Sequence, residues 1–81
     1  MIDLIPDARN ELVNKYQQLI AAGVVIELAE FSKPIDAPGF DELIEAGFYK
    51  KSGNPQNRMF RITGKGIAQA KSYLAVGISP A

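Results

Sequence analysis

The sequence contains no cysteine and no histidine. Their absence excludes a disulfide framework, zinc sites built from these ligands, and every catalytic pair in which histidine activates a nucleophile. None of its serines stands in the Gly-x-Ser-x-Gly turn that presents a hydrolase nucleophile. We therefore predict a protein that is not an enzyme and that uses no cofactor and no metal.

Long apolar runs are also missing. The longest, around residues 19–26, falls far below the roughly 20 residues that a membrane-spanning helix requires. The opening MIDLIPDARNEL is too polar for a signal peptide. We expect a cytoplasmic protein with no membrane contact, a location with which the lack of cysteine agrees. A chain of 81 residues predicts one domain over 1–81 with a small core and low net stability.

Acidic residues are absent beyond Glu45. The first 45 residues hold all nine carboxylates and three of the nine cations. The other six cations follow: Lys50, Lys51, Arg58, Arg61, Lys65 and Lys71. A net charge of zero thus conceals two oppositely charged halves. This asymmetry predicts that a polyanion or an acidic partner binds the C-terminal half.

Apolar periodicity predicts a first helix over 7–22. One face would carry Leu12, Val13, Tyr16, Leu19 and Ile20. Pro6 and Asp7 suit the start of this helix, and Gly23 suits its end. The β-branched residues that follow favour a short strand over 24–28, although Val24, Leu28 and Phe31 also share helical spacing.

The loop SKPIDAPG precedes a short helix predicted over 40–46 and ended by Gly47. The segments 48–51 and 58–63 then read as two antiparallel strands joined by a long polar tip, SGNPQN. Phe60 and Ile62 would face the core. We expect Thr63 to cap a last helix that ends at Gly77 and Pro80. Its buried stripe would be Ile67, Ala70 and Leu74.

The second half of the chain resembles a winged-helix domain over about residues 40–74. The matching residues are Leu43, Gly47 and Phe48, then Arg58, Phe60 and the run Ile62-Thr63-Gly64-Lys65-Gly66. In that family a helix ends in leucine, glycine and an apolar pair, and a β-hairpin forms the wing. The resemblance implies a small α+β winged-helix-like domain: helix, short strand, short helix, two-stranded wing and C-terminal helix. It also implies DNA binding and a role in transcription regulation.

The chain departs from the family where the DNA-reading helix belongs. The segment before the wing is about one helical turn too short for a helix-turn-helix, and Pro38-Gly39 falls where the recognition helix should begin. The remaining helix carries Asp41, Glu42 and Glu45, which would repel phosphate. These carboxylates form either an acid/base or metal site or, as we favour in the absence of histidine and cysteine, a solvated face. We expect that helix to face away from any bound nucleic acid.

The candidate binding residues lie on the wing. Four cations would contact phosphates, three amides at the tip would reach a groove, and a lysine at the start of the last helix would add charge. They are Lys50, Lys51, Arg58 and Arg61, then Asn54, Gln56 and Asn57, and finally Lys65. Alternatively, these lysines only keep an exposed hairpin from aggregating. Tyr49 would either stack on a base or, as we favour, pack across the strands with its hydroxyl in solvent.

Two functions follow from this pattern. The first is a non-catalytic module that binds duplex DNA through backbone contacts of the basic wing. The second is a protein–protein interaction module, such as a small regulator or phage-type inhibitor, that uses the same scaffold. It would bind an acidic protein surface on the wing or a basic one on the acidic helix.

Overall fold

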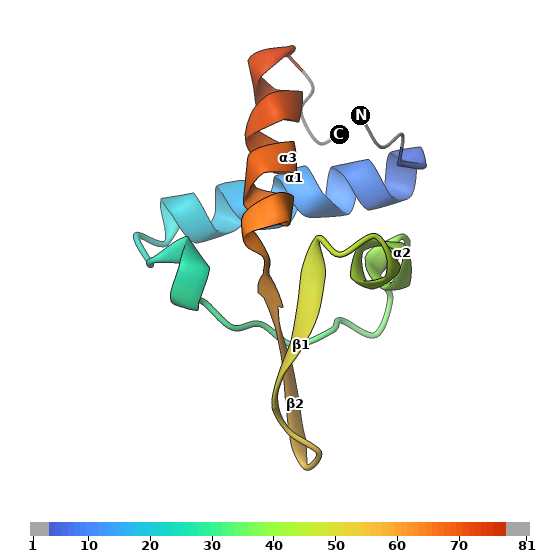
Figure 1. Cartoon of the computed structure of the whole chain (residues 1–81), viewed down its shortest axis with the longest axis vertical. Coiled ribbons are helices and arrows are strands. Elements are labelled where there is room, and N and C mark those ends of the chain that lie inside the picture. Colours follow the sequence, from blue (N-terminus) through green and yellow to red (C-terminus); the bar gives the residue numbers. More distant parts are fainter. Residues whose placement is uncertain (1–3, 78–81) are drawn as a thin grey trace.

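A two-stranded hairpin projects from a layer of helices in the computed structural model, which describes residues 4–77 (Figure 1). Within these residues the chain is an α+β domain with the order α1, a 3-10 helix η1, α2, β1, β2 and α3. The bounds are Pro6–Ala21, Ile26–Leu28, Phe40–Glu45, Tyr49–Asn54, Asn57–Ile62 and Gly64–Ala75. None of the described helices combines the length and the apolar character needed to cross a membrane.

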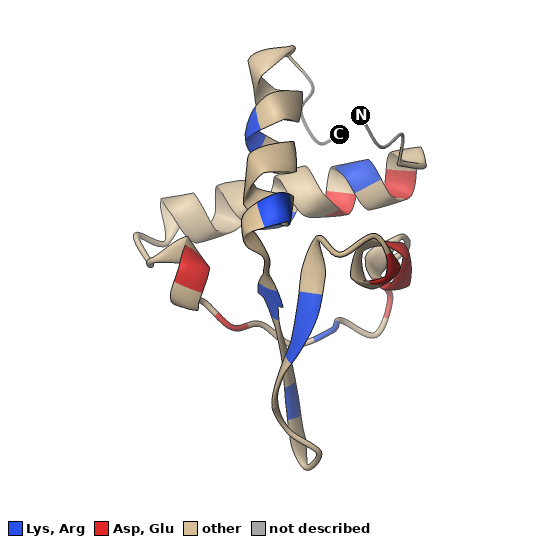
Figure 2. Cartoon of the chain, in the orientation of Figure 1, with Lys and Arg blue, Asp and Glu red and all other residues tan. Residues whose placement is uncertain are grey.

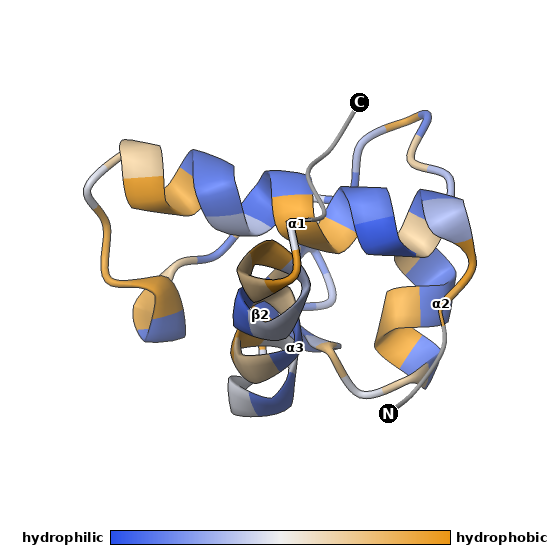
Figure 3. Ribbon diagram, turned by 90° about the horizontal axis from the view of Figure 1, so that it is seen from above, coloured by the Kyte–Doolittle hydropathy of each residue, from blue (hydrophilic) through white to orange (hydrophobic). Residues whose placement is uncertain are grey.

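Helix α1 crosses the middle of the molecule in Figure 1, and α3 runs across it on the side opposite to the hairpin tip. Seen from above, η1 and α2 lie at opposite ends of α1 (Figure 3). The predicted first helix is confirmed as α1, with Pro6 in its first turn and Leu12, Val13 and Tyr16 buried. The predicted apolar face is wrong at Ile20, whose side chain is exposed. At this end of α1 the described residues provide too little cover to bury it.

The strand predicted over 24–28 is wrong. Ile26–Leu28 form a 3-10 helix, closed by a hydrogen bond of 3.0 Å from the Leu28 N–H to the Val25 carbonyl. β-branched residues favour a strand only where a neighbouring strand can pair with them. Phe31 makes such a pairing with β2, because its N–H and C=O both form hydrogen bonds with Phe60, at 2.9 and 2.7 Å.

Strands β1 and β2 pair antiparallel, as predicted, from Tyr49 opposite Ile62 to Asn54 opposite Asn57. The long tip is a correction, because the ladder continues to a turn of two residues, Pro55 and Gln56. The Asn54 side-chain oxygen closes this turn by accepting the N–H groups of residues 56 and 57, at 3.1 and 2.7 Å. An asparagine that bonds to the backbone ahead of it replaces a longer loop.

Thr63 caps α3 as predicted, because its hydroxyl oxygen accepts the Gly66 N–H at 3.0 Å. A side chain at Gly66 would collide with the Phe48 carbonyl, so glycine lets this helix start against the hairpin. The predicted stripe is corrected at one position: Tyr73 is buried, whereas Leu74 is half-buried. Gly77 follows the helix, and Pro80 lies outside the described residues.

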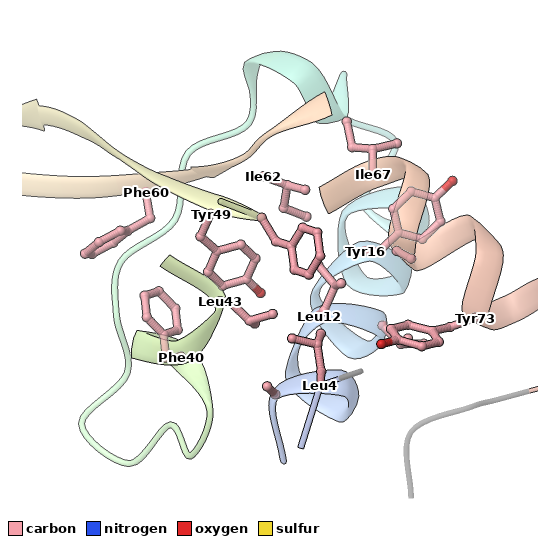
Figure 4. Packing of buried hydrophobic residues seen from close by; sticks show 14 of the residues in the cluster. Leu4, Leu12, Tyr16, Phe40, Leu43, Tyr49, Phe60, Ile62, Ile67 and Tyr73 are labelled. Atoms are coloured by element: carbon pink, nitrogen blue, oxygen red, sulfur yellow. The ribbon is translucent and has the colours of Figure 1, made fainter. Parts of the chain in front are cut away.

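An aromatic cluster joins the hairpin to the helices (Figure 4). The ring of Phe40 meets those of Tyr49 and Phe60 edge to face, each with centroids 5.0 Å apart, and that of Phe31 at 6.1 Å. Edge-to-face pairs of this kind add stability beyond the area they bury. The base of the hairpin is therefore fixed in place, whereas its outer part has no such packing.

Tyr49 departs from both sequence interpretations. Its side chain is only 1% exposed, and its hydroxyl donates a hydrogen bond of 2.7 Å to the Glu11 carboxylate on α1. It is therefore unable to stack on a base, and its hydroxyl does not lie in solvent. Burial, assisted by the nearby negative charge and the hydrogen bond of Glu11, raises the pKa of the Tyr49 phenol far above its ordinary value.

This buried phenol predicts a loss of stability in alkali. Above pH 10.0, the ordinary tyrosine pKa, the unfolded chain releases the Tyr49 proton while the folded chain keeps it. The contribution of Tyr49 is thus complete below that pH, and above it falls by about 1.4 kcal/mol per pH unit. Urea unfolding of wild type and Tyr49→Phe measures this contribution. The stability difference should shrink between about pH 9 and pH 11, and a constant difference would contradict the assignment.

Candidate functional site on the hairpin

The four cations of the hairpin divide between its two faces. Lys50 pairs with Arg61, so these two side chains share one face. Lys51 pairs with Phe60, and Arg58 lies one pair further along the same face, opposite Gly53. No carboxylate occurs in residues 49–62, and Figure 2 shows cations along the hairpin with carboxylates confined to the elements around its base. The hairpin is therefore a positively charged projection.

One face is partly neutralised from outside the hairpin. Glu30 lies beside Arg61, with its carboxylate oxygen 3.7 Å from the Arg61 Nε. The same carboxylate accepts a hydrogen bond from the Ser52 hydroxyl. A carboxylate held in this position offsets the charge of Arg61 and leaves Lys50 as the other cation on this face.

The opposite face borders a pocket of about 390 Å³, which we call the basic pocket. Lys51 and Arg58 line it together with Lys33, which comes from the loop before α2. Phe60 and Ile44 supply apolar lining, and Asp41 adds one carboxylate. The Lys33 ammonium contacts Asp41 at 2.8 Å. Three cations and one carboxylate give this pocket a net positive lining suited to an anion.

The tip presents the three predicted amides, Asn54, Gln56 and Asn57, all exposed. The Asn54 side-chain oxygen is already engaged in the turn, so its amide nitrogen is the group that remains to donate. Gln56 and Asn57 remain predicted contacts.

Lys65 lies apart from the hairpin cations. Its ammonium donates to the Ala46 carbonyl at 3.0 Å, at the end of α2, and lies 5.3 Å from the centre of the Phe48 ring. A cation at this position satisfies a free carbonyl and complements the negative end of a helix. Lys65 therefore has a structural role, and it does not line the basic pocket.

Sequence reasoning missed Glu30, Lys33 and the pocket position of Asp41. Glu30 and Lys33 reach the hairpin because the Phe31–Phe60 bridge holds their segment beside β2, and no periodic pattern in the sequence signals that bridge. Asp41 reaches the pocket from the first turn of α2. The expected solvated face of α2 holds for Asp41 and Glu45, which are exposed, whereas Glu42 is half-buried.

An exposed apolar surface lies where the end of α1 is followed by η1 (Figure 3). We call it the apolar corner: Leu19, Ile20, Val24, Val25 and Leu28. All but Ile20 line a pocket of about 340 Å³, and Val25 and Leu28 are 59% and 67% exposed. Adjacent exposed aliphatic side chains are typical of surfaces that bind another molecule.

Comparison of the chain with protein-family models, with curated proteins and with solved structures finds no match.

Proposed function

We propose that this domain binds nucleic acid through its hairpin, with backbone phosphates as the principal contacts. The observation that supports this function is the hairpin itself. Lys50, Lys51 and Arg58 are exposed on it, no carboxylate lies within residues 49–62, and it projects from the helices (Figure 2). Contacts of lysine and arginine with phosphate supply affinity without reading sequence.

The arrangement of elements supports a variant winged helix for this function. A helix precedes a short segment paired with β2, a second helix precedes the hairpin, and a third helix follows it. We propose that α2, with six residues, stands where such domains carry their recognition helix. Because Asp41 and Glu45 on α2 are exposed carboxylates, major-groove reading by this helix is unfavourable. The proposed binding is therefore largely independent of sequence.

Salt dependence tests this function. The logarithm of the binding affinity falls linearly with the logarithm of the salt concentration. Each phosphate contact adds about 0.9 to the steepness of that line. Replacing Lys50, Lys51, Arg58 and Arg61 with glutamine should lower this slope by about two to four and weaken all duplex sequences alike. The measurement is fluorescence anisotropy of a labelled random duplex over a salt series.

Lys71 provides the matched control, because it is an exposed cation on α3, away from the hairpin. Lys71→Gln removes one charge and should leave the slope unchanged. A slope that responds to Lys71→Gln as strongly as to one hairpin substitution, such as Lys51→Gln, would show that net charge, and not the hairpin, controls binding.

The apolar corner supports a second candidate function, a protein–protein interaction module such as a small regulator. Its exposed valines and leucine are the residues that a partner would cover. The two functions use different surfaces, residues 49–62 in one and residues 19–28 in the other. The surface that responds on titration therefore distinguishes them.

A further inference from the structure

We infer that the basic pocket holds a phosphate group of the bound nucleic acid and so determines which face of the hairpin meets the ligand. This inference rests on the proposed function. It adds a specific oxyanion site, made by Lys33, Lys51 and Arg58, to a general attraction between a basic hairpin and a polyanion.

The three cations come from separate parts of the chain, and the fold gathers them. Lys51 and Arg58 lie on the same face of adjacent strands. Lys33 lies two residues beyond Phe31, whose two backbone hydrogen bonds to Phe60 hold that segment beside β2. Phe60 is buried and Ile44 half-buried beneath the pocket. The three cations themselves are exposed. Each therefore attracts an anion with about the strength of a charge in water, and the site gains from having all three around one pocket.

The opposite face lacks such a site. Its Arg61 faces the Glu30 carboxylate, which also accepts the Ser52 hydroxyl. A phosphate there would meet a fixed negative charge with two partners already in place. Lys50 and Lys51 are adjacent in sequence and equal in charge. Because they lie on opposite faces, only Lys51 contributes to the pocket.

Asp41 is the carboxylate in the lining of the pocket. It contacts Lys33 at 2.8 Å, so an arriving phosphate competes with this carboxylate for the same ammonium group. Removing the charge of Asp41 frees Lys33 and also removes a repulsion. Glu45 lies on the same helix and is exposed, but it does not line the pocket. Asp41→Asn and Glu45→Gln thus change the net charge of the protein equally, but only Asp41→Asn removes a carboxylate from the pocket lining.

Two sets of charge-matched variants test the inference by anisotropy of a labelled random duplex at fixed low salt. Asp41→Asn should tighten binding about fivefold, the effect of about one unit-charge interaction at close range in water, and Glu45→Gln less than about twofold. Lys51→Gln and Lys33→Gln should each weaken binding about fivefold. Lys50→Gln should weaken it by less, because it removes a phosphate contact outside the pocket, and Lys71→Gln on α3 should change it less than about twofold. Circular dichroism with thermal unfolding verifies that each variant is folded.

The outcomes separate the pocket from the proposed function. If the duplex binds but the variants within each set behave alike, the pocket is overturned and hairpin binding stands. If no duplex binds, the proposed function is overturned, and so is a nucleic-acid phosphate in the pocket. Pyrophosphate and a poly-glutamate peptide then identify the source of the oxyanion. Shifts of the residue 33, 51 and 58 amides with pyrophosphate would retain an oxyanion site, and shifts with the peptide alone would assign it to carboxylates. No shift with either would overturn the site.

Discussion

Replacing Phe40 with alanine should lower the free energy of unfolding by about 3–5 kcal/mol. Phe40 is 0% exposed, and its ring meets those of Phe31, Tyr49 and Phe60. Truncation removes these contacts and leaves a cavity between α2 and the hairpin. A domain of this size has a total stability of only about 4–12 kcal/mol, so the variant should be near the limit of folding. Urea denaturation measures the change.

The control is Ile35→Ala, because Ile35 is fully exposed in the loop before α2. It should leave the midpoint of the urea transition unchanged. Phe60→Ala, which removes another ring of the cluster, should fall in the same range as Phe40→Ala. If Phe40→Ala and Ile35→Ala have equal effects, the aromatic cluster does not fix the hairpin to the helices.

Gly39→Ala should cost about 3 kcal/mol, from two effects that act together. Gly39 has φ of +84°, a left-handed conformation that an alanine adopts at a cost of about 1–2 kcal/mol. In addition, a Cβ atom there would overlap the backbone of Ala8, because α2 begins directly against α1. Relieving that overlap requires the helices to separate, at about 1–3 kcal/mol. Thermal or urea unfolding gives the total.

Gly23 separates the two effects. Its φ is +73°, but a Cβ atom built there has no neighbour within 4 Å. Gly23→Ala should therefore cost only the conformational part, about 1–2 kcal/mol. Equal losses in the two variants would show that the close approach of α1 and α2 contributes nothing.

Locally encoded elements were predictable from the sequence. The spacing of Leu12, Val13 and Tyr16 sets the period of α1, and Thr63 supplies the cap of α3. The change to alternating Phe60 and Ile62 marks the hairpin. These signals depend only on residues close together in the sequence. The predicted element boundaries therefore agree with those of the structure to within a few residues.

Features that depend on distant partners were not predictable in this way. The segment after Gly23 has strand-forming residues, yet the backbone bridge to β2 in the described residues is made by Phe31. The sequence predicted that the Tyr49 hydroxyl lies in solvent, whereas in the fold it donates a hydrogen bond to Glu11 of α1. The candidate site divides similarly. Its hairpin cations were evident from charge, whereas Lys33 and Asp41 required the tertiary fold.

Titration of the isotope-labelled chain with a random duplex, followed by its amide NMR spectrum at low and then moderate salt, tests nucleic-acid binding by the hairpin most directly. Binding through the hairpin should shift the amides of residues 49–62 and of Lys33 at low salt. The shifts should reverse as salt is added, because phosphate contacts release counterions. Residues 19–28 should not move. Absence of shifts in residues 49–62 at low salt, or shifts confined to the apolar corner, would contradict the proposed function.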